Sequence, residues 1–196
     1  MMAELAKSTE KAAPVREQDQ TQEAPKFFID SRPRLFKLPE FKDKEKINVR
    51  YPLLPPYAFA HIHWDSKAKE LMYDVEQQLL NDSERELLNL IQLGLEEMIN
   101  ISFRYATKSN LILKYLEKNV QSILAELGAK VSKESYLKIM YYVYRDFIGL
   151  NEMEPLLNDP YIEDIECNGI NSSVYVVHRK YQNLRTNIVY MEKAQL

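Results

Sequence analysis

The spacing of hydrophobic residues predicts three consecutive amphipathic helices in the middle of the chain. Apolar residues recur at helical intervals in three stretches, which are Leu88, Ile91, Leu95 and Met98, then Ile112, Leu116, Val120, Ile123 and Leu127, and then Tyr136, Met140, Val143 and Phe147. Ser83 and Glu86 fit a capping box, Gly128 fits a helix C-terminus, and Ser132 fits a helix start. The predicted helices cover 83–103, 109–127 and 132–149. Since each apolar stripe must be covered, we expect a three-helix bundle.

A β-hairpin is predicted before these helices. Residues 57–64 alternate between two faces, one of which carries His61 and His63. A short apolar run at 71–75 follows a polar connection, and two such runs are typical of an antiparallel hairpin. The proline-rich segment 51–56 is interpreted as a break before the hairpin.

The C-terminal part is predicted to begin a second domain built on a sheet. Pro155 fits the first turn of a short helix and Pro160 fits its end. Strands are expected at 162–167, 174–179 and 185–190, with the start of a helix at 191–196. Two or three strands with one apolar face are marginal alone, so this small antiparallel sheet domain, 150–196, is expected to be truncated. The predicted fold class is α+β, with 51–149 as the hairpin-plus-three-helix domain.

The N-terminal region divides into two segments. Residues 1–25 have few large apolar side chains, so we expect a disordered tail. Residues 26–50 form an arm in which eight basic residues are mixed with aromatic and aliphatic ones. The arm is either a strap on the chain's own core or an extension that contacts a partner, a lipid surface or nucleic acid. Its candidate membrane or partner contacts are Lys37, Lys42, Lys44 and Lys46.

Composition narrows the class of protein. The chain of 196 residues has 26 Lys and Arg against 29 Asp and Glu, which argues against a nucleic-acid partner. One cysteine, Cys167, excludes an internal disulfide and a thiolate zinc cluster. The sequence has neither an apolar run long enough for a membrane span nor a secretory signal, so a cytoplasmic protein is expected.

The sequence offers no catalytic, cofactor-binding or metal-binding motif. Its four glycines do not fit a phosphate-binding loop, and the dinucleotide, nucleophile-elbow and zinc-helix patterns are also missing. His61 and His63 are either a polar pair on a strand or, with a distant residue such as His178, metal ligands. We therefore assign no catalytic residue and no metal to this chain.

Opposite charges cluster in the C-terminal third. The six acidic residues are Glu152, Glu154, Asp159, Glu163, Asp164 and Glu166, and the basic group is His178, Arg179, Lys180 and Arg185. The carboxylates are solvated or capping groups, partners for a neighbouring subunit, or catalytic acids and bases. In the second reading, the candidate contacts between subunits or with a partner are Glu154, Asp159, Glu163, Asp164, His178, Arg179, Lys180 and Arg185.

One stretch is specific enough to suggest a family. Residues 154–169, EPLLNDPYIEDIECNG, lead into 174–180, VYVVHRK. This pattern resembles the N-terminal part of the archaeal secretion ATPases that drive archaellum rotation, type IV pilus assembly and type II or type IV secretion. A looser similarity covers 51–75, and residues 1–50 show none.

The resemblance implies a non-catalytic N-terminal domain of a hexameric ATPase. ATP and Mg would bind a later domain, because the family's phosphate loop, its nucleotide-reaching arginines and its acidic and histidine boxes lie beyond the position of Tyr190. The implied partners are a membrane platform protein, cytoplasmic subunits of the machine and other copies of the chain, with no nucleic acid. The implied location is the cytoplasm, peripheral at the inner face of the cell membrane. The alternative is a stand-alone helical adaptor or regulator without ATPase activity.

Overall fold

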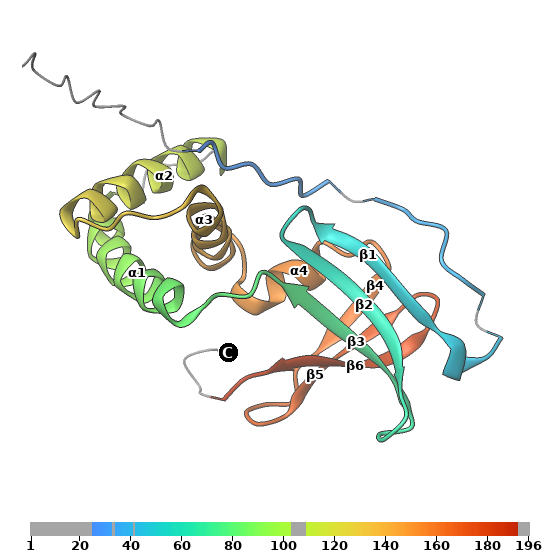
Figure 1. Ribbon diagram of the computed structural model, residues 1–196. Coiled ribbons are helices and arrows are strands. Elements are labelled where there is room, and N and C mark those ends of the chain that lie inside the picture. The colour runs from blue at the N-terminus through green and yellow to red at the C-terminus, as the bar shows by residue number, and fades with distance from the viewer. Residues whose placement is uncertain (1–24, 33, 41, 103–108, 192–196) are drawn as a thin grey trace, which may run out of the picture.

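The computed structural model describes residues 25–32, 34–40, 42–102 and 109–191. These residues form four α-helices and a six-stranded curled sheet (Figure 1). In chain order the elements are the 3-10 helix η1 (Lys44–Lys46), β1 (Asn48–Leu54), β2 (Ala58–Asp65), β3 (Glu70–Gln77), α1 (Asp82–Ser102), α2 (Ser109–Glu126), α3 (Lys133–Phe147), the 3-10 helix η3 (Asn151–Met153), α4 (Glu154–Leu157), β4 (Ile162–Glu166), β5 (Ser173–His178) and β6 (Gln182–Val189). The tail predicted at 1–25 lies outside the described residues except for its last position. The helix start predicted at 191–196 also lies outside them except for its first position.

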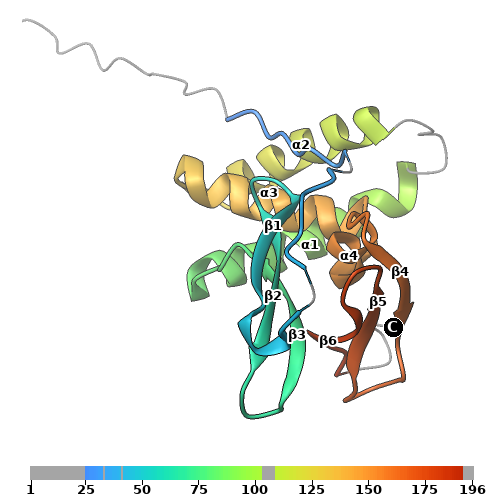
Figure 2. The same cartoon turned by 90° about the vertical axis from the view of Figure 1, so that its right-hand side faces the viewer.

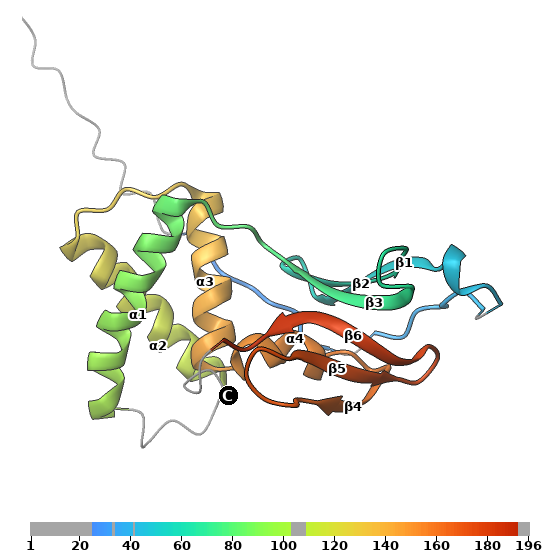
Figure 3. The ribbon, with the colours of Figure 1, turned by 90° about the horizontal axis from the view of Figure 1, so that it is seen from below.

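The sheet has the strand order β1-β2-β3-β6-β5-β4. Pairing of β2 with β3 confirms the predicted hairpin. All neighbours are antiparallel except β3 and β6, which pair in parallel at Met72 with Arg185 and at Tyr73 with Thr186. Through this short junction the strands at 162–189 join the same sheet as the hairpin. Figure 3 shows β1–β3 and β4–β6 as two facing layers.

One strand was missing from the sequence prediction. The interpretation of 51–56 as a break is wrong, because residues up to Leu54 belong to β1. Pro52 is tolerated there because β1 lies at the edge of the sheet, where the missing N–H costs no ladder hydrogen bond. The pairing with β2 shifts in register between Pro52 and Leu54.

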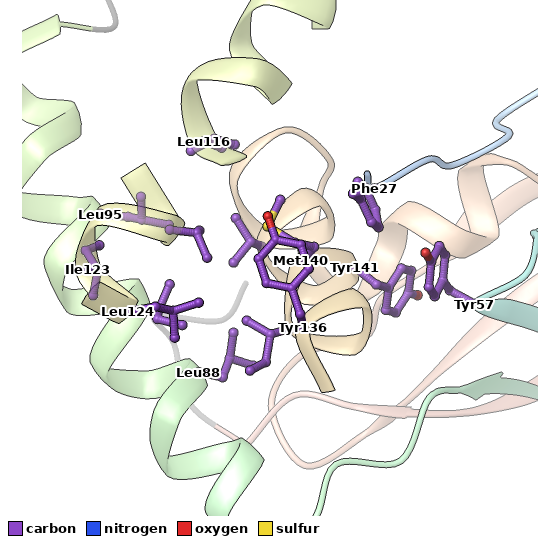
Figure 4. Packing of buried hydrophobic residues seen from close by; sticks show 14 of the residues in the cluster. Phe27, Tyr57, Leu88, Leu95, Leu116, Ile123, Leu124, Tyr136, Met140 and Tyr141 are labelled. Atoms are coloured by element: carbon purple, nitrogen blue, oxygen red, sulfur yellow. The ribbon is translucent and has the colours of Figure 1, made fainter. Parts of the chain in front are cut away.

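The helical predictions agree closely with the structure. Helices α1, α2 and α3 begin and end within about two residues of the predicted limits, as expected for pattern-based boundaries. Ser132 caps α3 by accepting the N–H of Ser135 at 3.0 Å. The three helices pack around a first core in which Leu95, Leu116 and Met140 are completely buried (Figure 4). Among the described helices, none combines the length and the apolar character needed to cross a bilayer.

A second core fills the curled sheet, and the arm contributes to both cores. Phe27 is buried in the first core, while Leu38 and Ile47 are buried in the second. Figure 2 shows the arm passing between β1 and α4. The apolar residues of the arm named above therefore pack on the chain's own core, as the strap interpretation expects. Lys37 and its neighbouring lysines remain on the surface.

Candidate functional site

A buried aspartate joins distant segments of the sheet core. Asp159, in the turn after α4, is only 4% exposed. Its Oδ2 accepts hydrogen bonds from the hydroxyls of Tyr51 on β1 at 2.5 Å and Tyr73 on β3 at 2.6 Å. Its Oδ1 accepts the backbone N–H of Tyr161 at 2.8 Å. We call Asp159, Tyr51, Tyr73 and His178 the Asp159 cluster.

His178 on β5 extends this cluster. It is 1% exposed, and its Nδ1 accepts the backbone N–H groups of Lys180 and Tyr181, both at 3.2 Å. Because a ring nitrogen that accepts N–H groups carries no proton, the neutral imidazole carries its proton on Nε2. Nε2 lies 3.3 Å from the hydroxyl oxygen of Tyr51. His178 therefore donates to Tyr51, which donates in turn to Asp159.

Burial determines the protonation of His178, Tyr51 and Tyr73 in this cluster. Desolvation lowers the pKa of His178 to about 4, although the nearby Asp159 carboxylate acts in the opposite direction. Desolvation and, to a smaller extent, the charge of Asp159 hold the pKa of Tyr51 far above its usual range. Burial also raises the pKa of Tyr73. At neutral pH the imidazole is uncharged and both phenols keep their protons. Such an arrangement suits a structural junction, because neither the imidazole nor the two phenols exchange a proton near pH 7.

The hydrogen-bonding groups around this cluster also hold the arm. The backbone N–H of Phe36 donates to the hydroxyl of Tyr161 at 2.5 Å, and that hydroxyl donates back to the carbonyl of Phe36. Lys180 Nζ donates to the carbonyl of Leu38 at 2.7 Å. Residues 36–39 are thereby fixed to the β4–β5 side of the sheet. All buried side-chain nitrogen and oxygen atoms in the described part of the chain have a hydrogen-bond partner.

A cleft of about 630 Å³ opens at the end of the sheet farthest from α1–α3. Figures 1 and 3 show that η1, the β2–β3 turn and the β5–β6 turn all lie at this end of the sheet. Each of these segments supplies a basic residue to the lining, namely Lys44, Lys69 and Arg179. Trp64 and Tyr181 add aromatic surface. We call this feature the tip cleft.

Two carboxylates also line the tip cleft, and each is paired with an arginine. Arg179 Nε lies 3.1 Å from Glu163, and Arg185 Nε lies 2.9 Å from Glu70. Lys69 is exposed and forms no ion pair with any residue that the structure describes. The lining therefore keeps the positive charge of Lys69 after these two pairs are formed.

Three of the predicted contact residues make their bonds within the chain. Asp159 and His178 lie inside the second core. Glu154 accepts the backbone N–H of Leu150 at 3.1 Å and the amide of Asn158 at 2.9 Å. Glu154 thus stabilises the turn between α3 and α4, and the buried pair connects β1, β3 and β5.

The other predicted contact residues reach solvent. Glu163 and Arg179, expected to pair across subunits, are close enough to pair within one chain. The remaining residues with solvent access are Asp164, Lys180, Arg185, Lys37, Lys42, Lys44 and Lys46. Of the arm lysines, Lys46 pairs with Asp43 at 2.8 Å. Contact of these residues with another subunit, a partner or a membrane stays a prediction.

His61 and His63 lie on the outer face of β2, opposite the core that contains His178. Their ring centroids are 4.7 Å apart. His61 Nδ1 lies 3.1 Å from a carboxylate oxygen of Glu76, and His63 Nε2 lies 2.9 Å from one of Asp74. Within the described ranges, no group of three or more His, Cys, Asp or Glu side chains is arranged to hold a metal ion.

Sequence reasoning missed the residues that complete both features. Tyr51 lay in the supposed break, and Tyr73 was one member of an apolar run. The chain has 13 tyrosines, and nothing in their spacing shows which of them meet Asp159. Trp64 and Lys69 lie at either side of a turn, where no motif identifies them as cleft residues.

Comparison with known proteins gives two archaeal relatives. No model of a known protein family matches the chain. It is 27% identical over 135 residues to the uncharacterized protein MJ1288 of Methanocaldococcus jannaschii, a match that covers 69% of this chain and 53% of that protein. It is 30% identical over 176 residues to the uncharacterized protein MJ0900 of the same organism, a match that covers 80% of this chain and 31% of that protein. The chain therefore spans about half the length of the first relative and about a third of the second.

Proposed function

We propose that this chain is the non-catalytic N-terminal module of an archaeal secretion-type ATPase. In this proposal a later domain binds ATP and Mg, and the module transmits its motion to an archaellum, type IV pilus or secretion machine. It does so through contacts with neighbouring subunits in a hexamer, with a membrane platform protein and with cytoplasmic subunits of the machine. The three-helix bundle of α1–α3 and the curled sheet are the two bodies that carry these contacts.

The junction at Asp159 is the observation that carries the proposal. The two segments that resemble the family, 51–75 and 154–180, are separated by the three helices. Asp159 belongs to the second segment, and its hydrogen bonds with Tyr51 and Tyr73 connect it to the first. A module that transmits force needs such a rigid connection, because a loosely joined pair of segments would absorb the motion. The resemblance therefore covers one packed unit rather than two unrelated stretches.

The relatives are consistent with a module inside a longer protein. Both are archaeal, and the matched region makes up 53% of one and 31% of the other. The proposal predicts that the unmatched part of these relatives contains Gly-x-x-x-x-Gly-Lys followed by Ser or Thr, the loop that holds nucleotide phosphates.

The direct test uses the protein expressed from its complete gene. We expect light scattering to give the mass of a hexamer in the presence of ATP and Mg, and a phosphate-release assay to show ATP hydrolysis. Tyr73→Phe should leave ATP binding intact, because Tyr73 lies outside the proposed nucleotide-binding domain. The hexamer should gain less ATPase activity over the monomer in this variant, because the substitution removes one hydrogen bond from the junction at Asp159. A monomer that does not bind ATP would contradict the proposal and favour the adaptor.

The proposed place at the membrane has its own test. Replacing the four exposed arm lysines Lys37, Lys42, Lys44 and Lys46 by Glu should abolish sedimentation with vesicles that contain anionic lipid, since each basic residue near such a surface contributes about 1 kcal/mol. The matched control replaces four exposed lysines of the helical half, Lys114, Lys118, Lys130 and Lys133. Equal loss in both variants would show non-specific attraction and would remove the assignment to the arm.

A further inference from the structure

We infer that the tip cleft binds an acidic segment of a partner protein, in which carboxylates flank an apolar or aromatic side chain. The inference rests on the proposed function, because a contact module needs a surface for its partner. It adds where that surface lies and what chemistry the partner offers.

The first reason is the convergence of three cationic side chains. Lys44, Lys69 and Arg179 come from three separate segments but line one cleft. The segment around Lys44 packs against β2 and β3, which places η1 beside the β2–β3 turn that carries Lys69. Arg179 approaches from the β5–β6 turn. Folding thus gathers positive charge at the end of the sheet, where a partner can reach it.

The second reason is the mixture of charges. Glu70 and Glu163 lie among the cations and are neutralised by Arg185 and Arg179. A compact phosphate dianion fits this lining poorly, because Arg179 is already paired with Glu163 and the carboxylates of Glu70 and Glu163 lie beside the cations. A peptide can place its own carboxylates near Lys69 and away from them, so alternating charge favours a protein partner.

The third reason is the apolar part of the lining. Trp64 is half-buried and contributes to the cleft together with Leu71 and Val177. Tryptophan in a partly open pocket offers a large rigid contact surface, which is why it is enriched in protein interfaces. An apolar side chain of the partner would pack against Trp64, and acidic side chains on either side of it would lie near the lysines of the cleft.

The turns that frame the cleft have unusual backbone conformations. Lys69 has φ 54 and Gln182 has φ 63, and both side chains line the tip cleft. Long side chains uncommonly adopt the left-handed region, where Gly and Asn are more frequent. Such conformations are often retained where they position residues for binding. Here both residues line the tip cleft, one from the β2–β3 turn and one from the start of β6.

The test uses the only tryptophan of the chain as a reporter. Trp64 lies in the cleft, so intrinsic tryptophan fluorescence reads this site alone. The full chain is titrated with a twelve-residue peptide that contains Asp-Glu-Leu-Phe-Asp-Glu between Gly and Ser residues. The control peptide replaces each Asp by Asn and each Glu by Gln. We expect a saturable change in fluorescence that weakens with added salt for the acidic peptide, and none for the control.

Variants then locate the binding. Lys44→Gln together with Lys69→Gln should weaken binding about tenfold, since each exposed ion pair contributes a few-fold. Lys114→Gln together with Lys118→Gln on α2 removes the same charge far from the cleft and should leave the affinity unchanged. Equal weakening in both double variants would overturn the site.

Two further outcomes would overturn the inference. One is a fluorescence response to the control peptide equal to that of the acidic peptide. The other is a stronger response to inorganic phosphate than to the acidic peptide at equal concentration, which would indicate a phosphate site. Neither outcome depends on ring formation or ATP hydrolysis, so failure here is distinguishable from failure of the proposed function.

Discussion

The hydroxyl of Tyr51 donates a 2.5 Å hydrogen bond to the carboxylate of Asp159, 108 residues later in the chain. Both groups are buried, and Tyr73 donates to the same oxygen. A buried carboxylate that accepts several hydrogen bonds is strongly favoured over one left without partners. This contact therefore connects the first strand of the sheet with the turn before β4.

Removing the carboxylate should destabilise the protein strongly. Asp159→Ala leaves two phenol hydroxyls without an acceptor, so the free energy of unfolding should fall by about 3–5 kcal/mol. Asp164→Ala is the matched control, because that side chain is exposed and, among the described residues, accepts a hydrogen bond only from the neighbouring N–H of Ile165. Its cost should stay below about 0.5 kcal/mol. Urea denaturation measures both, and similar midpoints would contradict the role of Asp159.

Stability should also decrease on mild acidification. In the unfolded chain His178 gains its proton near pH 6.5, whereas in the folded protein burial lowers its pKa to about 4. The unfolded state thus binds more protons between these values, and stability falls as the pH drops through this window, by at most about 3 kcal/mol. His178→Gln should reduce the slope between pH 6.5 and 4. Parallel curves for the two proteins would rule out His178 as the cause.

The hydroxyl of Tyr161 should control the order of the arm. Tyr161→Phe removes both hydrogen bonds with the backbone of Phe36 and keeps the aromatic ring. Hydrogen exchange of the amides in 34–40 should become faster, while global stability should fall by only about 1 kcal/mol. Tyr175→Phe, on the outer face of β5, serves as control. If exchange of the arm were unchanged, other contacts would hold it.

Gly149 should not tolerate even a methyl group. An added Cβ would lie 2.7 Å from the carbonyl oxygen of Arg145 and 2.6 Å from Cγ of Glu154. Because the carbonyl belongs to the backbone, Gly149→Ala should cost about 2–3 kcal/mol. A Cβ added at Gly128 would meet no atom within 4 Å, but this residue has a positive φ of 61°. Gly128→Ala should therefore lower the free energy of unfolding by only about 1 kcal/mol, from backbone strain alone. Thermal unfolding compares the two, and the reverse order would contradict the close approach.

The local patterns explain why the helices could be predicted. Ser132 and Gly128 act through hydrogen bonds and backbone conformations within a few residues, so their effect is visible in the sequence. The position of a strand at the edge of a sheet cannot be read from local sequence in this way. Pro52 indicated a break, yet it lies in β1 because only the tertiary arrangement places that strand at the edge of the sheet.

The sequence by itself determined the three long helices, the hairpin and the presence of charged clusters, because hydrophobic spacing and capping are local properties. Only the tertiary structure decided which charges are internal and which face solvent. The parallel pairing of Met72 with Arg185 brings the two halves of the sheet together. That contact joins residues 113 positions apart. Such pairing depends on the packing of whole surfaces, for which no short pattern exists.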